Sequence, residues 1–119
     1  MSDPRELSLT WTSPQPDVAY VTLAGDLDYD SADALATAVN GMLESDSVRE
    51  LRLDCAGVQY CDSYGLSTLL MVRRRTAEAG IALHLDNRGP ALDRLLRVTN
   101  TLEHLTGRGA RAREEQFDS

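Results

Sequence analysis

The stretch from Leu51 to Leu85, LRLDCAGVQYCDSYGLSTLLMVRRRTAEAGIALHL, changes its hydrophobic period twice. At its start apolar residues alternate with charged ones, and this alternation predicts a strand from Leu51 to Cys55. A short linker through Gly57 should follow, because glycine interrupts the alternation there. The first segment is therefore predicted to end well before the polar residues that come next.

From Ser63 to Gly80 the period becomes helical, with one apolar face made by Leu66, Leu69, Leu70 and Ala77. Alternation then returns at Ile81, Leu83 and Leu85. Strand, helix and strand in this order predict a right-handed β-α-β unit with parallel strands.

Outward from this unit, the pattern predicts further elements on both sides. Residues 7–11 and 18–23 read as two strands of a hairpin, joined by a proline-rich turn at residues 13–17. A helix should begin at an N-cap at Asp30 or Ser31 and end near residues 44–46. Pro90 suits the first position of a third helix, and Leu102 and Leu105 can add a last strand or turn. The predicted fold is α/β, a single domain over residues 1–106 with a mixed, mostly parallel sheet flanked by helices, followed by a polar and disordered tail at 107–119.

Composition excludes several functions. The 119 residues carry a net charge of −7, which disfavours binding to a phosphate backbone. All twelve basic residues are arginine, so no lysine can serve as a Schiff base, a general base or a Walker-type phosphate ligand. Two cysteines match no metal or redox spacing, and neither a signal peptide nor an apolar span is visible. We expect a cytoplasmic protein with no nucleic-acid or membrane partner.

Ser63 follows a strand pattern and opens a helical one, which is also where α/β-hydrolases present a nucleophile. The match to Gly-x-Ser-x-Gly is partial, because Cys61 occupies the first glycine position and only Gly65 agrees. The two histidines, His84 and His104, are not on an evident catalytic loop. We therefore expect no enzyme activity.

Cofactor and metal motifs are also incomplete. The sequence has neither a Walker motif nor Gly-x-Gly-x-x-Gly. Alternating aspartates at Asp26, Asp28 and Asp30 resemble the start of an EF-hand loop, but the required glycine and distal glutamate are missing. We expect no bound cofactor or metal.

A regulatory role needs only an exposed hydroxyl that another enzyme can reach. Phosphate on Ser63 would add about −1.5 to −2 charges at pH 7. A helix N-terminus accommodates such a group without unfolding the domain. The adjacent Asp62 would add to the negative charge that a docked partner meets.

Three segments resemble the anti-sigma factor antagonists of the STAS domain superfamily over about residues 7–105: Leu23-Ala24-Gly25-Asp26-Leu27-Asp28, Leu51-Arg52-Leu53-Asp54 and Asp62-Ser63-Tyr64-Gly65-Leu66. The resemblance implies partner switching without catalysis. The unmodified antagonist binds an anti-sigma factor serine kinase, which holds the ATP, and so frees a sigma factor. The kinase then phosphorylates the antagonist, and a serine phosphatase resets it.

Carried over by residue, the resemblance makes Ser63 the phosphorylated serine. It places Asp28, Asp62, Tyr64 and Gly65 with Ser63 in the partner-binding surface. Tyr64 departs from the family, which usually has serine or threonine at this position, so a larger ring lies beside the acceptor. The alternative is a STAS scaffold subunit of a transporter or lipid-handling ATPase complex, in which Ser63 is only a helix cap.

Overall fold

The computed structural model of the chain describes residues 5–99 and Leu105. Its sheet has the order β1 (Ser8–Gln15), β2 (Val18–Leu27), β3 (Glu50–Cys61) and β4 (Ala82–Asp86). β1 pairs antiparallel with β2, whereas the β2–β3 and β3–β4 pairs are parallel. The predicted mixed, mostly parallel sheet is therefore confirmed.

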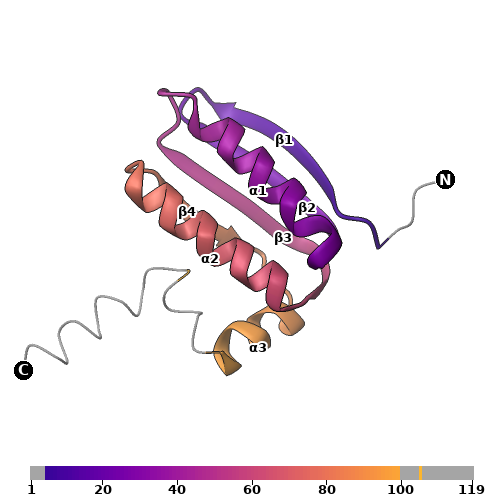
Figure 1. The fold of residues 1–119 in the computed structure, drawn as a ribbon. Helices are drawn as coiled ribbons and strands as arrows, with labels where there is room; N and C mark the ends of the chain where they lie inside the picture. The colour runs from indigo at the N-terminus through magenta and orange to yellow at the C-terminus, as the bar shows by residue number, and fades with distance from the viewer. Residues whose placement is uncertain (1–4, 100–104, 106–119) are drawn as a thin grey trace, which may run out of the picture.

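Two helices, α1 (Tyr29–Leu43) and α2 (Ser63–Glu78), lie side by side over one face of this sheet (Figure 1). The third, α3 (Pro90–Val98), begins at Pro90 as predicted and lies near the end of β3. Leu105 is fully buried, while Leu102 and the predicted tail at 107–119 lie outside the described residues.

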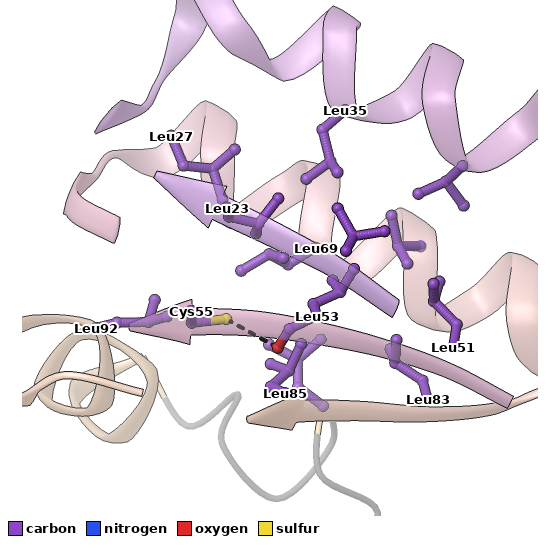
Figure 2. Packing of buried hydrophobic residues seen from close by; sticks show 14 of the residues in the cluster. Leu23, Leu27, Leu35, Leu51, Leu53, Cys55, Leu69, Leu83, Leu85 and Leu92 are labelled. Atoms are coloured by element: carbon purple, nitrogen blue, oxygen red, sulfur yellow. Dashed lines mark hydrogen bonds between the residues drawn. The ribbon is translucent and has the colours of Figure 1, made fainter. Parts of the chain in front are cut away.

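The core lies between the sheet and the two helices. Alternate residues of β2 are buried, and they meet leucines of β3 and of both helices (Figure 2). In α2 the buried face is completed by Val72 and Thr76, whereas Ala77, which the helical pattern placed on the apolar face, is exposed. The Thr76 hydroxyl donates to the carbonyl of Arg73 at 3.0 Å, which lets a polar residue lie in the core.

β3 is longer than its sequence pattern predicts. The expected linker after Cys55 is strand, and β3 continues to Cys61. Two register shifts against β2 explain the difference, one between Thr22 and Ala24 and the other between Gly25 and Asp26. Each irregularity breaks the simple alternation of side chains while the strand continues.

α1 begins earlier than predicted. Its N-cap is Asp28, neither Asp30 nor Ser31, and Asp28 has extended dihedrals of φ −141° and ψ −169°. Ser31 lies at the third helical position, where its hydroxyl accepts from the Asp28 N–H at 2.9 Å. The helix ends at Leu43 with Glu44 as C-cap, next to the predicted boundary.

The sheet face that points away from α1 and α2 carries a polar network. Arg52 on β3 binds both carboxylate oxygens of Asp86 at 3.0 and 3.1 Å. Asp54 accepts hydrogen bonds at 3.1 Å from each of three donors, the Ala56 N–H, the Asn87 side chain and the Tyr20 hydroxyl. These hydrogen bonds connect β2, β3 and the turn after β4.

This network predicts acid sensitivity. The main-chain bond from Ala56, followed by the Asn87 bond, lowers the pKa of Asp54. Because the folded pKa lies below the unfolded value of about 3.9, the stabilisation is present above pH 4 and is lost as pH falls further. We expect Asp54→Asn to destabilise the protein at neutral pH, with a difference that shrinks on acidification. Urea unfolding at several pH values measures this, and a difference independent of pH would contradict it.

Candidate functional site

The starts of α1 and α2 are built in the same way. β2 ends at Leu27, one residue follows, and α1 begins; β3 ends at Cys61, one residue follows, and α2 begins. The single intervening residues are Asp28 and Asp62, and each is the N-cap of its helix. Because Leu27 pairs with Cys61 in the parallel β2–β3 ladder, the two helix N-termini lie next to each other.

Asp62 joins these two N-termini. Its Oδ1 accepts from the Gly65 N–H of its own helix at 2.9 Å. Its Oδ2 accepts from the Tyr29 N–H at 3.2 Å, in the first turn of α1. Its own N–H donates to the Leu27 carbonyl at 3.1 Å. One carboxylate thus satisfies donors of both helices that have no partner within their own helix.

Within the described residues, the Asp28 carboxylate makes its hydrogen bonds only with residues of α1. Its Oδ1 accepts from the N–H groups of Asp30 and Ser31 at 3.1 and 3.2 Å. The buried Ser31 hydroxyl in turn accepts a hydrogen bond from the Asp28 N–H, and this second bond completes a capping box. This carboxylate therefore lies beside the joined helix starts but is engaged in capping.

Ser63 is exposed and is the first residue of α2. It does not cap the helix, because Asp62 does, so the interpretation of Ser63 as only a helix cap is wrong. Its hydroxyl has no hydrogen-bond partner among residues 5–99 and 105. An exposed and uncommitted hydroxyl beside two helix N-termini is accessible to an incoming active site.

Three exposed tyrosines lie at the starts of α1 and α2 and near the end of β3. Tyr64 contacts Tyr29 edge to face, with ring centroids 4.9 Å apart and planes at 76°. Tyr29 is 68% exposed, and Tyr64 and Tyr60 are each 55% exposed. The motif identified Tyr64, but Tyr29 and Tyr60 were missed. Their only sequence signal is position, since each lies close to the end of a parallel strand.

Gly65 allows α2 to approach the end of β2. It is buried, and a Cβ at this position would collide with the Leu27 carbonyl oxygen and lie 2.8 Å from the Leu27 Cγ. The glycine therefore sets the distance between the start of α2 and the strand, and with it the position of Ser63.

The groups needed for nucleophilic catalysis are not assembled by the residues that the structure describes. His84 lies on β4, 3.4 Å from Glu50 at the opposite end of β3 from Ser63. His104 lies outside the described residues. Burial, reinforced by the charge of Asp62, raises the pKa of Cys61 to about 11, so its thiol is neutral at pH 7.

A hollow of about 530 Å³ opens beside the Asp28 cap, between the α1 N-terminus and residues preceding β1. Its lining residues are Arg5, Glu6, Leu7, Asp26, Asp28, Asp30, Ser31 and Ala34. Within residues 5–99 and 105, no three acidic, histidine or cysteine side chains are grouped closely enough to hold a metal ion. The three aspartates that resembled an EF-hand therefore line an open surface.

Two parallel strands are each followed by a capped helix, and an exposed serine is the first residue of the second helix. This arrangement can be compared with known proteins. Residues 12–106 match the model of a family described as "Mlab, STAS domain". The chain belongs to the STAS domain family.

Solved structures with a similar fold have more than one kind of functional description. An anti-sigma factor antagonist from Mycobacterium paratuberculosis is 26% identical with a TM-score of 0.70, and the alignment covers 89% of this chain and 87% of that one. A sulfate transporter family protein from Wolinella succinogenes is 21% identical with a TM-score of 0.68, covering 89% and 84%. The phosphorylated form of the Bacillus cell fate determinant SpoIIAA is 14% identical with a TM-score of 0.66, covering 79% and 85%.

The last two similarities show a shared fold. The fold is thus shared with a protein described as a cell fate determinant and with one described as a sulfate transporter family protein. None of the helices in the described part of this STAS domain is long and apolar enough to span a membrane.

Proposed function

We propose that this STAS domain is an anti-sigma factor antagonist that acts in the cytoplasm and is switched off by phosphorylation of Ser63. The observation that carries the proposal is the exposed Ser63 hydroxyl beside the joined starts of α1 and α2. The 26% identity with an anti-sigma factor antagonist along 89% of the chain supports it. Asp28, Asp62 and Tyr64 then form, with Ser63, the surface that docks on the kinase, whereas Gly65, which the resemblance also placed in this surface, is buried and only positions the start of α2.

In the proposed cycle the unmodified domain binds an anti-sigma factor serine kinase, and the sigma factor is released. The kinase holds ATP and magnesium. The Ser63 oxygen attacks the γ-phosphorus, loses its proton, and displaces ADP. A serine phosphatase later hydrolyses the phosphoserine. This chain supplies the acceptor and the docking surface, and the catalysis belongs to its partners.

The charge of the phosphate accounts for dissociation. A docked kinase that places a carboxylate about 5 Å from the phosphate would meet a repulsion of roughly 0.8–3 kcal/mol per pair of unit charges. Since 1.4 kcal/mol corresponds to a tenfold change in affinity, one such pair is enough to release the partner. Asp62 and Asp28 already make this end of the domain acidic, so the phosphate adds to a negative charge that is present before modification.

Phosphorylation is tested with the full chain, its cognate kinase and ATP, by intact-mass spectrometry. The parent is expected to gain one phosphoryl group and Ser63→Ala none. Ser67→Ala is the matched control, because Ser67 is also exposed and lies one turn later in α2. Labelling of Ser63→Ala as strong as that of the parent would overturn the assignment.

The charge mechanism has its own readout in the same experiment. Ser63→Asp is expected to bind the kinase about tenfold more weakly. Its thermal stability should be nearly unchanged, because a helix N-terminus tolerates an acid. Unfolding of Ser63→Asp would point to a structural cause instead of surface charge.

A scaffold subunit of a transporter or lipid-handling ATPase complex is the second candidate. The family description "Mlab, STAS domain" and the similarity to a sulfate transporter family protein favour it. Affinity purification of the tagged chain separates the two candidates. A serine kinase in the eluate supports the antagonist, and a membrane ATPase or transporter supports the scaffold.

A further inference from the structure

The two edges of the sheet differ in how well they are protected from pairing with another strand. β4 has five residues, carries His84, and ends in the charged Asp86. β1 has eight residues, Ser8–Gln15, and none of them is charged. Exposed edges pair readily with other strands, and natural proteins usually block them with charged residues or short lengths. β1 is longer than β4 and has no charged residue, so neither form of protection applies to it.

β1 is also accessible. Within the described part of the chain it pairs with β2 alone, so its outer row of main-chain donors and acceptors faces away from the sheet (Figure 1). Only Leu9 is half-buried, and the other seven residues are exposed, including Trp11 at 37%. Pro14 and the irregularity between Thr12 and Gln15 limit regular pairing to the segment Ser8–Thr12.

Part of this segment is symmetric in sequence. The segment reads Ser-Leu-Thr-Trp-Thr, and its last three residues, Thr10-Trp11-Thr12, form a palindrome. When two such strands pair antiparallel about Trp11, each Trp11 lies opposite its copy and each Thr10 lies opposite Thr12 of the other chain. Aromatic pairs and threonine pairs across antiparallel strands are both stabilising.

We propose that two copies of this chain associate through β1, in antiparallel register about Trp11, to form one continuous eight-stranded sheet. A two-fold axis perpendicular to the sheet keeps the helices of both copies on the same face, because directly opposed residues then point to the same side. The chain carries a net charge of −7, which opposes self-association through charged surfaces. Because β1 carries no charged residue, two copies can approach each other along this edge with less repulsion.

The dimer is independent of the proposed phosphorylation. Ser63 follows β3, and β2 separates β3 from the new contact. Each copy therefore keeps its own acceptor serine accessible.

The test is sedimentation equilibrium of the full chain from micromolar to millimolar concentration. We expect a species of twice the 13.1 kDa monomer mass at the upper end. Trp11 is the only tryptophan, so its emission should shift to the blue as concentration rises and its ring becomes covered. A monomer at every concentration would overturn the proposal.

Charge variants locate the contact. Trp11→Lys places two like charges directly opposite each other in the dimer, and Thr10→Lys places a charge on the same edge strand. Each substitution is expected to weaken the dimer at least tenfold. Ala82→Lys is the matched control, because Ala82 is an exposed residue of the opposite edge strand, and its dimer should be unchanged. Circular dichroism confirms that the variants are folded. A dimer that survives both β1 substitutions would also overturn the proposal.

Discussion

Gly65→Ala is expected to destabilise the domain by about 3 kcal/mol, at the upper end of the usual cost of overpacking. The added methyl would collide with the Leu27 carbonyl oxygen, and this is main chain that cannot rotate away. The same carbonyl accepts the Asp62 N–H at 3.1 Å, so a shift of Leu27 also disturbs the cap of α2. Urea unfolding gives the free energy of unfolding directly.

Gly41→Ala provides the control for this substitution. Gly41 is also helical, lying in α1, but a Cβ there would meet nothing within 4 Å. Alanine should therefore stabilise the protein by up to about 1 kcal/mol through its better helix propensity. The two glycine-to-alanine changes are thus expected to have opposite signs. A stabilised Gly65→Ala variant would show that α2 does not depend on this close approach.

Asp62→Ala is expected to cost about 2–3 kcal/mol, because it removes two hydrogen bonds that involve different helices. Loss of the bond to Gly65 leaves α2 without its cap, and loss of the bond to Tyr29 frees a donor at the start of α1. Asp62→Asn should be intermediate, since an amide has one acceptor oxygen where the carboxylate has two. Thermal or urea unfolding of the three proteins gives the order.

Hydrogen exchange separates this double role from ordinary capping. In Asp62→Ala the Tyr29 amide should exchange faster, although it belongs to another helix and lies 33 residues away in the sequence. Asp33→Ala, which removes an exposed carboxylate from the second turn of α1, should leave the Tyr29 rate unchanged. Unchanged exchange at Tyr29 in Asp62→Ala would contradict the connection between the helices.

The sequence pattern predicted the elements whose side chains keep a regular period. The β-α-β unit and the second strand of the hairpin were found this way, because one face of each is buried. The first hairpin strand keeps the alternation although seven of its eight residues are exposed, and the start of α3 was predicted from Pro90 itself. Asn40 and Gly41 lie within α1, in agreement with the predicted helix that ends near residues 44–46. The hairpin turn is shorter than expected, because β1 extends through Pro14 to Gln15.

The errors have local causes. The end of β3 was read as a linker because two register shifts interrupt the alternation of its side chains. The α1 cap was placed at Asp30 or Ser31 because several adjacent residues have side chains suitable for capping. Only the extended backbone of Asp28 distinguishes it from them. Sequence alone does not carry that information.

The candidate site was predicted in part. Ser63 and its neighbours lie in one short motif, and Asp28 came from the resemblance to the family. The Asp62–Tyr29 bond and the Tyr29–Tyr64 contact depend on the pairing of Leu27 with Cys61, which joins segments far apart in the chain. Periodicity describes each segment separately and does not give their register.

The contact between Tyr29 and Tyr64 bears on how related domains would diverge. If Ser63 is the phosphate acceptor, as proposed above, a cell with several such domains must give each acceptor serine a different surrounding surface. Here that surface is shared by two rings from separate segments, so a change in one ring alters the packing of the other. Related domains that recognise different partners would then be expected to differ at both ring positions together, one at the start of α1 and one at the start of α2.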